Sequence, residues 1–304
     1  EGELKLSRGS DQEILIERVR EQIDEYLRET LCKKKIPDIL AQSIAYSLLD
    51  GGKRVRPALC VITAESLGVE PSRVLPLAAA FEMVHTASLI HDDLPCMDND
   101  DYRRGKLTNH KVYGESMAVL AGDSLLAFAF EISLYELPKQ GFSQSHILRA
   151  LGILSNAIGP SGICGGQALD ITQEHGEDNE EFLWKMSELK TATLLRASLT
   201  APAALVGVDG QTMSCLHNYG THMGISFQIV DDILDVTGTI SELGKTPGKD
   251  EASGKVTFVS FYGLQKAKEL ALNETKKAVE AITPLGEKFK VFVEIVEHFT
   301  RRSR

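Results

Sequence analysis

The residues from Leu77 to Leu94 read LAAAFEMVHTASLIHDDL, and this stretch decides the fold class. Placed on a helix, its side chains are apolar on almost every side. A helix that is apolar all round lies at the centre of a bundle, where other helices cover it. The stretch therefore predicts a buried central helix that ends on Asp92 and Asp93.

The rest of the chain also has helical spacing. Apolar residues recur every three or four positions from Leu15 to Leu27, with charged residues between them. Further helices are predicted over residues 38–49, 115–137, 145–158, 179–206 and 211–236. The last stretch, residues 264–300, is polar and amphipathic, and strand-type alternation is almost absent. We expect breaks at glycines and prolines, among them Pro76, but no long linker. These features predict an all-α chain in which residues 1–10 form a flexible tail and residues 11–304 form a single large helical bundle with its site between facing helices.

Composition argues against several classes of protein. The 304 residues carry a formal net charge of −10, which disfavours broad contact with nucleic-acid phosphates. The 5 cysteines are an odd number without a Cys-x-x-Cys pair, so neither a zinc ribbon nor a disulfide framework is expected. No run of about 18 apolar residues occurs, and we expect no membrane span. The chain does not begin with Met, which is typical of a mature or trimmed form, and no targeting peptide is visible.

The cluster Asp231-Asp232-Ile233-Leu234-Asp235 has the spacing of a metal site. Asp231 and Asp235 are four positions apart and share one face of a helix, with Asp232 beside them. Their carboxylates repel each other unless a cation lies between them, and Mg²⁺ fits because it prefers hard oxygen ligands. The alternative is a solvated acidic face, which the apolar neighbours of these aspartates disfavour.

A second cluster, from Asp92 to Asp98, has a different spacing. Its ends are six positions apart, which on an ideal helix does not place them on one side. Pro95 makes an uninterrupted helix improbable at this point. We therefore expect the central helix to end near Asp93 and the chain to loop so that Asp98 returns toward the same metals.

Basic residues accompany both clusters. Lys53, Arg54 and Arg56 follow Gly51-Gly52, Arg103-Arg104-Gly105-Lys106 follows the first cluster, and Lys190, Lys245 and Lys249 bracket the second. A basic cluster is often only a solvated surface. Acidic and basic clusters in alternation favour a site that holds metal ions and diphosphates together, because Arg and Lys suit oxyanions. No Walker-type glycine loop is present, which disfavours nucleotide hydrolysis.

In its motifs the chain resembles the trans-type polyprenyl diphosphate synthases over nearly its whole length. The motifs, in order, are Gly-Gly-Lys-Arg-Val-Arg-Pro (51–57), Met-Val-His-Thr-Ala-Ser-Leu-Ile-His-Asp-Asp (83–93), Asp-Tyr-Arg-Arg-Gly (101–105), Gly-Gly-Gln-Ala-Leu-Asp (165–170), Lys190-Thr191, Phe-Gln-Ile-Val-Asp-Asp-Ile-Leu-Asp (227–235) and Gly-Lys-Thr-Pro-Gly-Lys-Asp (244–250). The four residues inside the first cluster resemble the bacterial and plastid branch. The sequence Cys-Met-Asp-Asn-Asp (96–100) is similar to the corresponding motif of plastid geranylgeranyl diphosphate synthases.

This resemblance implies the head-to-tail addition of isopentenyl diphosphate to an allylic diphosphate (dimethylallyl, geranyl or farnesyl) in a bundle with a central cavity. It implies that three substrate-bridged Mg²⁺ ions bind to Asp92, Asp93, Asp98, Asp231, Asp232 and Asp235. Arg103, Lys190 and Lys245 would contact the allylic diphosphate. Lys53, Arg56, His85 and Arg104 would hold isopentenyl diphosphate, and Lys249 would also bind substrate. Thr191 and Gln228 would line the place where the carbocation forms, and Gln167 and Asp170 would lie near the second cluster.

The resemblance also implies how the product's length is limited. The hydrocarbon tail would run alongside the central helix past three small residues, Ser88, Ala87 and Val84, where an aromatic side chain would stop growth after a C15 chain. Each further five-carbon unit gains roughly 3–4 kcal/mol from burial, so one ring can decide the length. We expect geranylgeranyl diphosphate (C20), with C25 or longer as the alternative.

Two rival functions are weaker. A terpene cyclase would have a single Asp-rich motif and would lack Lys53 and Arg56, and a regulatory subunit of a heteromeric synthase would have lost one aspartate cluster. The resemblance implies a homodimer, or a heteromer with a related subunit, and a plastid location rather than a cytoplasmic one. The apolar stripe of Met117–Phe130 is the candidate interface, although burial within one subunit explains it equally well.

Overall fold

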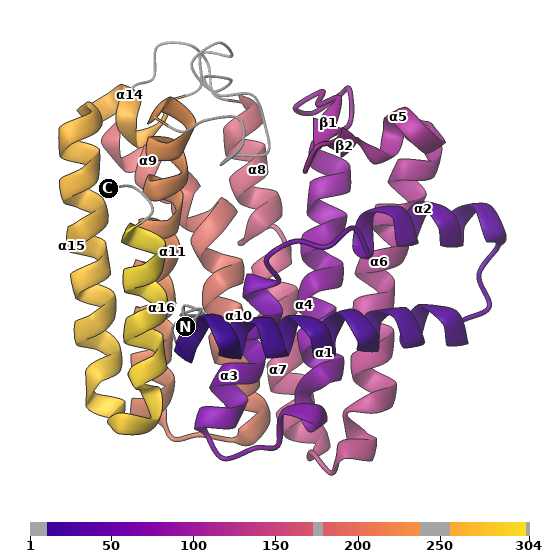
Figure 1. The fold of residues 1–304 in the computed structure, drawn as a ribbon, viewed down its shortest axis with the longest axis horizontal. Coiled ribbons are helices and arrows are strands. Elements are labelled where there is room, and N and C mark those ends of the chain that lie inside the picture. The colour runs from indigo at the N-terminus through magenta and orange to yellow at the C-terminus, as the bar shows by residue number, and fades with distance from the viewer. Residues whose placement is uncertain (1–10, 173–178, 238–255, 302–304) are drawn as a thin grey trace, which may run out of the picture.

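The chain folds as a bundle of helices in a computed structural model that describes residues 11–172, 179–237 and 256–301 (Figure 1). Its first half comprises α1 (Asp11–Lys33), α2 (Asp38–Leu48), α3 (Val55–Ser66), α4 (Pro71–Asp92), the strands β1 (Tyr102–Arg103) and β2 (Lys106–Leu107), α5 (Asn109–Tyr113) and α6 (Glu115–Glu136). A 3₁₀ turn (Pro138–Gln140) leads to α7 (Gln144–Ile158), α8 (Ile163–Thr172), α9 (Glu180–Ser187), a π-helical turn (Glu188–Ala192), α10 (Thr193–Val206) and α11 (Gly210–Thr237). The chain closes with α14 (Phe258–Tyr262), α15 (Leu264–Ile282), two 3₁₀ turns (Thr283–Leu285 and Glu287–Phe289) and α16 (Lys290–Arg301). The all-α prediction is confirmed.

Helix α4 is the central helix that its sequence predicts. Its residues from Leu77 to Val84 are all buried, and it packs against α1, α2, α3, α6 and α10. In Figure 1, α1 crosses in front of the bundle, α15 lies at its left edge, and α2 and α5 extend to the right of α6. The helix begins at Pro71, so the break expected at Pro76 is wrong. Proline is favourable at a first helical position, and Pro76, in the second turn, removes only one backbone hydrogen bond.

The second half of the bundle forms around α11, which packs against α10, α15 and α16. Two glycines of α11 allow close approaches of other backbone segments. A Cβ atom on Gly220 would lie 2.6 Å from the Cα of Arg196, and one on Gly224 would lie 2.4 Å from the Cα of Ala192. These distances are shorter than atomic contact permits, so α11 meets the backbone of α10 at Arg196 and that of the π-helical turn at Ala192 only because both glycines lack a side chain.

The helix predicted over residues 179–206 is interrupted by the π-helical turn at Glu188–Ala192. Lys190 and Thr191 lie in this turn, which joins α9 to α10. A π turn inserts one extra residue and is frequent at functional sites. Hydrophobic spacing does not reveal it, because the apolar residues on either side keep helical periodicity.

Three helical stretches have the length and composition of membrane-spanning helices, although none is an uninterrupted apolar run: Pro71–Asp92, Glu115–Gln140 and Gln144–Thr172. In the first, which is α4, 72% of the most apolar window is buried inside the bundle. Packing in the core therefore accounts for its composition.

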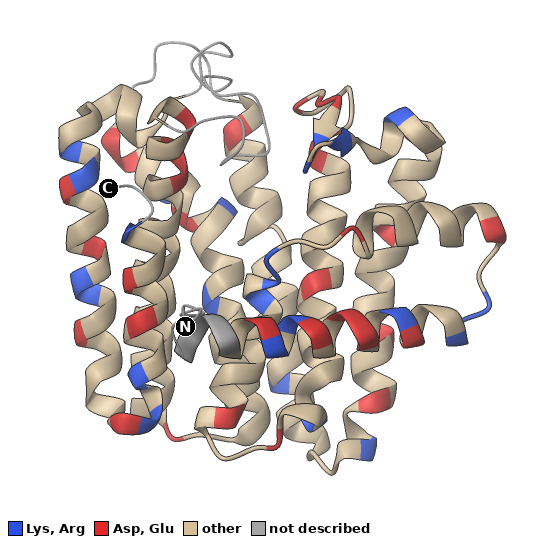
Figure 2. Cartoon of the chain, in the orientation of Figure 1, with Lys and Arg blue, Asp and Glu red and all other residues tan. Residues whose placement is uncertain are grey.

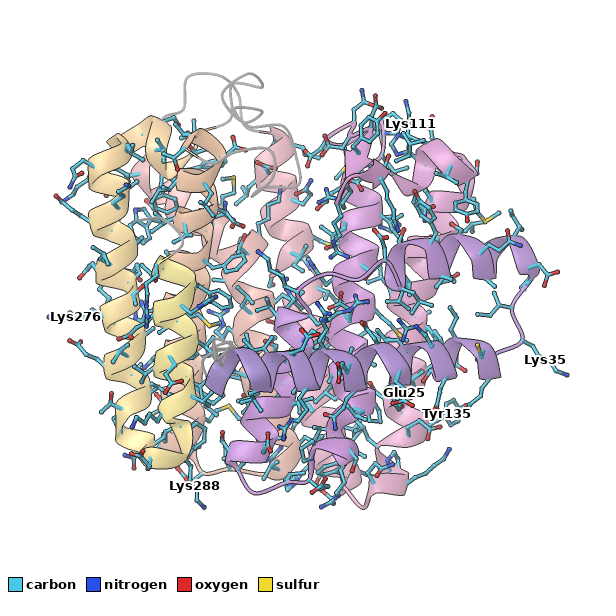
Figure 3. All side chains as sticks on the ribbon, in the orientation of Figure 1. Glu25, Lys35, Lys111, Tyr135, Lys276 and Lys288 are labelled. Carbon is cyan, nitrogen blue, oxygen red and sulfur yellow. The ribbon has the colours of Figure 1, made fainter. Side chains whose placement is uncertain are left out.

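The stripe proposed for dimerisation divides into two sets of side chains. Leu125 and Phe128 are buried in the core of the subunit, whereas Val119 and Leu120 are 40% and 51% exposed. Further along α6, Leu134 and Tyr135 are also exposed, and Tyr135 projects from the end of the helix in Figure 3. Only the second set offers an apolar surface to another chain.

Candidate active site

The first aspartate cluster lies at the end of α4, where acidic and basic residues are next to each other (Figure 2). Helix α4 ends at Asp92, as predicted. The backbone N–H of Asp98 then donates to the carbonyl oxygen of Asp92 at 2.9 Å, and the N–H of Asp100 donates to the carbonyl of Asp93 at 3.2 Å. The chain therefore turns back on itself after the helix, which confirms the predicted loop.

A two-stranded hairpin, which sequence periodicity did not reveal, follows this loop and presents Arg103. Tyr102 pairs with Leu107 and Arg103 with Lys106, so that Arg104 and Gly105 form the turn. The Nε of Arg103 donates to both carboxylate oxygens of Asp93 at 2.9 Å. Asp93 is only 3% exposed, and its charge is thus compensated by a protein cation rather than by water. A guanidinium fork on a carboxylate is a strong, oriented interaction.

Arg104 extends from the hairpin turn onto the backbone of Gly51 and Gly52. Its φ is 52° and that of Gly105 is 79°, values that two-residue hairpin turns require but that a side chain such as Arg rarely adopts. Its Nη1 donates to the carbonyl oxygen of Gly51 at 2.9 Å. A Cβ atom on Gly52 would lie 2.8 Å from the guanidinium carbon. The missing side chain of Gly52 therefore makes the space that the guanidinium group of Arg104 occupies.

Arg56 and His85 lie beside this pair of segments. The Nη1 of Arg56 lies 3.3 Å from the Nε2 of His85, and the Nε of Arg56 is buried with no hydrogen-bond partner. Burial lowers the pKa of His85 well below its usual value, and the charges of Arg56 and Arg104 add to this effect. Burial also lowers the pKa of Arg56 to about 10, partly opposed by Glu82 and Asp231. At neutral pH the imidazole is therefore uncharged while the guanidinium keeps its charge.

Arg54, within the same basic motif, has a structural role that its sequence position did not indicate. Its side chain is fully buried, and it donates to Asp24 at 2.8 Å, to Glu82 at 2.5 Å and to the carbonyl of Leu48 at 2.8 Å. These partners belong to α1, α4 and α2. Arg54 thus fixes the start of α3 against three other helices. Arg56 lies in the first turn of α3, so Arg54 also fixes the position of Arg56.

Lys190, in the π turn, connects the two halves of the site. Its Nζ donates to Asp170 of α8 at 2.6 Å, and the Asp170 side chain is 5% exposed. Burial raises the pKa of Asp92 to about 6, while the positive charges of Lys190 and Arg103 oppose this rise and Asp98 and Asp93 add to it. Lys190 is therefore close enough to act electrostatically on the end of α4.

The second cluster lies in the last turns of α11. Asp231 is exposed, whereas Asp232 and Asp235 are 5% and 2% exposed. Asp232 accepts hydrogen bonds from Gln228 at 2.8 Å and from the backbone N–H of Phe258 at 2.9 Å, and Gln228 in turn accepts from the hydroxyl of Thr191 at 2.5 Å. Gln228, Asp232, Lys190 and Asp170 line a cavity of about 100 Å³.

The donor set fits Mg²⁺. The carboxylates of Asp93 and Asp98 act electrostatically on Asp92, and since Arg103 already binds Asp93, the carboxylates of Asp92 and Asp98 remain as hard oxygen donors of the kind that Mg²⁺ prefers. Within the described residues, no three His, Cys, Asp or Glu side chains already converge as a complete metal site. An ion held by one or two carboxylates with waters and substrate phosphates, as Mg²⁺ commonly is, agrees with this arrangement.

The remaining predicted residues form four groups. Lys53, at the start of the segment that carries Arg56, lines a groove of about 360 Å³ between α1, α3 and α16. Val84 and Ala87 are 1% and 0% exposed inside the core, and Ser88 donates to the carbonyl oxygen of His85 at 2.8 Å. Lys245 and Lys249 lie outside the described residues. Gln167 of α8 is buried, and neither its amide oxygen nor its nitrogen has a hydrogen-bond partner.

Comparisons with known proteins agree with these features. Residues 37–296 match the family model described as polyprenyl synthetase. The chain is 41% identical over 285 residues to a dimethylallyltranstransferase of Fischerella ambigua (strain UTEX 1903), covering 93% of this chain and 82% of that protein. It is 48% identical over 240 residues to heterodimeric geranylgeranyl pyrophosphate synthase large subunit 1, chloroplastic, of Arabidopsis thaliana, covering 78% of this chain and 65% of that protein. Among solved structures, a geranyltransferase from Legionella pneumophila superposes with a TM-score of 0.86 at 32% identity, covering 96% of this chain and 97% of that one.

Proposed function

Because this chain belongs to the polyprenyl synthetase family of transferases, we propose that it adds isopentenyl diphosphate head-to-tail to allylic diphosphates and that its main product is geranylgeranyl diphosphate. The observation that carries the proposal is the position of two sets of charges. Arg56, Arg104 and the neutral His85 form an anion-binding cluster beside the carboxylates at the end of α4. Such an arrangement suits one diphosphate bound directly by cations and a second bound through metal ions.

The allylic diphosphate would lie between the two aspartate clusters. We propose that Asp92, Asp98, Asp231 and Asp235 hold three Mg²⁺ ions that the substrate bridges, with Arg103, Lys190 and Lys245 on the same diphosphate. Bound there, Mg²⁺ supplies Lewis-acid stabilisation of the charge that develops on the leaving group. Arg103 and Lys190 are already oriented by their carboxylate partners, so little reorganisation is needed when that charge appears.

Isopentenyl diphosphate would bind to the guanidinium groups of Arg56 and Arg104, with Lys53, Lys249 and His85 also in contact. The buried Nε of Arg56 offers a donor that is not otherwise used. His85 does not suit the role of a general base, because arginine can only donate and the Nε2 of His85 must therefore accept from it. Removal of the proton in the last step thus falls to the released diphosphate, and no protein base is required.

Thr191 and Gln228 would face the carbocation that forms when the allylic C–O bond breaks. Their oxygens can approach a positive charge without forming a bond to it, and the short hydrogen bond between them restricts their motion. This role requires that the oxygen lone pairs, and not the hydrogens, point toward the cation.

The product's length would be set by the residues next to the end of α4. Val84 and Ala87 are small and buried. We propose that the growing prenyl chain passes along this side of α4 and displaces the side chains that pack there. The chloroplastic Arabidopsis relative is named as a geranylgeranyl pyrophosphate synthase subunit, which supports a C20 product. The same name supports a plastid location for this chain and, as an alternative to a homodimer, association with a related subunit. In either assembly the exposed apolar residues of α6, Val119, Leu120, Leu134 and Tyr135, would form the interface.

The experiment is a primer screen with purified protein, Mg²⁺ and radiolabelled isopentenyl diphosphate. Dimethylallyl, geranyl and farnesyl diphosphate should each be extended to C20. Asp92→Asn should lower kcat on the order of 10³-fold, because it removes a metal ligand. Asp123→Asn, the same change at an exposed position of α6, serves as the control and should not alter turnover. Absence of product with all three primers would refute the proposed function.

A further inference from the structure

Asp232 accepts hydrogen bonds at both of its carboxylate oxygens from protein donors. The Nε2 of Gln228, one turn earlier on α11, donates to its Oδ1 at 2.8 Å. The backbone N–H of Phe258 donates to its Oδ2 at 2.9 Å. Phe258 is the first residue of α14, and its N–H has no acceptor inside that helix, so Asp232 satisfies a donor that would otherwise be unpaired. The side chain is therefore held in one orientation by two separate elements.

The chemistry of these groups fixes the direction of each hydrogen bond in the series that links Phe258, Asp232, Gln228 and Thr191. A backbone N–H can only donate and an ionised carboxylate can only accept. Gln228 must consequently turn its NH₂ group toward Asp232, which leaves its Oε1 for Thr191. The hydroxyl of Thr191 must then donate to that oxygen, at 2.5 Å. With its hydrogen directed at Gln228, the hydroxyl has only lone pairs left to present elsewhere.

We propose that Asp232 is a positioning residue that fixes the direction of the Thr191–Gln228 hydrogen bond, so that Thr191 presents lone pairs rather than its hydrogen to the developing allylic cation. The inference rests on the proposed function and replaces the metal-binding role that the family resemblance implies for Asp232. Asp232 acts through Gln228 on Thr191 without needing to touch the substrate.

Asparagine at position 232 has nearly the same shape as aspartate but reverses the direction of the hydrogen bond to Gln228. In Asp232→Asn the side-chain oxygen remains the acceptor for Phe258 N–H, and the new NH₂ group faces Gln228. The Gln228 amide must turn over to accept from it, and its own NH₂ then donates to the oxygen of Thr191. The Phe258 N–H, the Gln228 amide and the Thr191 oxygen each keep a hydrogen-bond partner, but the Thr191 hydrogen now points away from Gln228, where it opposes positive charge.

A second substitution restores the original direction. In Asp232→Asn with Gln228→Glu, the carboxylate of residue 228 accepts from both the asparagine NH₂ and the Thr191 hydroxyl. The negative charge moves by one turn of helix, the hydrogen bonds remain complete, and Thr191 donates again. If residue 232 had to bind a metal ion, the double variant would not recover activity, because the carboxylate is no longer at that position.

The test measures kcat, KM for both substrates, the Mg²⁺ concentration for half-maximal rate and thermal unfolding for the wild type, the single variant and the double variant. Asp232→Asn should lower kcat by about 100-fold, comparable to the loss of one oxyanion-hole donor, with both KM values and the Mg²⁺ requirement unchanged. The double variant should recover at least a tenth of the wild-type kcat. In a Thr191→Val background, Asp232→Asn should have little further effect, because its target is gone.

Three results would overturn the inference. The first is an Asp232→Asn protein with wild-type kcat. The second is a loss of activity that additional Mg²⁺ restores, which identifies Asp232 as a metal ligand. The third is an effect of Asp232→Asn that is as large in the Thr191→Val background as in the wild type. All three presuppose an active wild type, so they differ from failure of the proposed function, in which the wild type extends no primer.

Discussion

Gly52→Ala should weaken the binding of isopentenyl diphosphate by displacing the side chain of Arg104. The added Cβ atom would lie 2.8 Å from the Cζ, Nη1 and Nη2 of Arg104, closer than real contacts allow. The guanidinium group is the end of a flexible side chain, so it should move and lose its hydrogen bond to the Gly51 carbonyl. Losing one charged hydrogen bond costs about 1.5–3 kcal/mol. If Arg104 binds isopentenyl diphosphate, KM for that substrate should rise about 10- to 100-fold.

Gly51→Ala is the matched control for this prediction. Gly51 also has a positive φ, 77° against 108° for Gly52, but a Cβ atom there meets nothing within 4 Å. Both variants therefore strain the backbone, and only Gly52→Ala displaces Arg104. Steady-state kinetics with each substrate varied in turn should show a rise in KM for isopentenyl diphosphate in Gly52→Ala alone, with KM for the allylic diphosphate unchanged. Equal effects of the two substitutions, or an unchanged KM in Gly52→Ala, would show that the position of Arg104 does not determine the binding of isopentenyl diphosphate.

Three further predictions concern stability and product length. Arg54→Leu should lower the free energy of unfolding by about 3–5 kcal/mol, measured by denaturant titration, since it leaves the buried charge of Glu82 and the partly buried charge of Asp24 without their partner; a loss below 1 kcal/mol would contradict the structural role. Burial raises the pKa of Glu274, but hydrogen bonds from His222 and Lys277 outweigh this effect and lower the pKa overall. The carboxylate therefore stabilises the fold above its unfolded pKa of about 4.5, and this stabilisation is lost as the pH falls through the lower pKa of the folded state. Glu274→Gln should thus lower the melting temperature at pH 7 but not near pH 3, and an equal loss at both pH values would count against it. Ala87→Phe should shorten the main product to C15 in the radiolabelled assay, whereas an unchanged product length would show that the chain does not grow past this residue.

The buried helix α4 could be predicted because its evidence is local. A run that is apolar on every face has one stable location in a soluble bundle, and Pro95 shows where the helix must end. The position of its start could not be predicted in the same way. Proline at residue 76 reads as a break, but near the beginning of a helix it removes only a single hydrogen bond, and the burial of Val74 and Leu77 outweighs that loss.

The roles of individual charged residues were less accessible from the sequence. Arg54 and Arg56 are two positions apart in one basic motif, yet one is fully buried against Asp24 and Glu82 and the other adjoins His85. Asp93 stands next to Asp92, but Arg103 holds it at the base of the hairpin. Such differences depend on which partner the fold brings within hydrogen-bond distance, and a motif names residue types without naming partners.

The π-helical turn was hidden for a related reason. Glu188–Ala192 has apolar neighbours at ordinary helical spacing, so periodicity predicts a continuous helix. The turn follows from tertiary packing: a Cβ atom on Gly166 would lie 2.5 Å from the backbone N of Lys190, and Gly224 meets Ala192 equally closely. Only these glycines, on α8 and α11, allow the turn to bring Lys190 and Thr191 to Asp170 and Gln228.

We propose that the two aspartate clusters form one site that binds Mg²⁺ only together with a diphosphate. Calorimetric titration of Mg²⁺ into the protein, with and without a non-reactive allylic thiodiphosphate, tests it most directly. We predict weak binding of Mg²⁺ alone, tight binding once the analogue is present, and loss of that tight binding in both Asp92→Asn and Asp231→Asn. Tight binding of Mg²⁺ without the analogue, or tight binding that survives substitution of either cluster, would show that the two clusters do not form one diphosphate-dependent site.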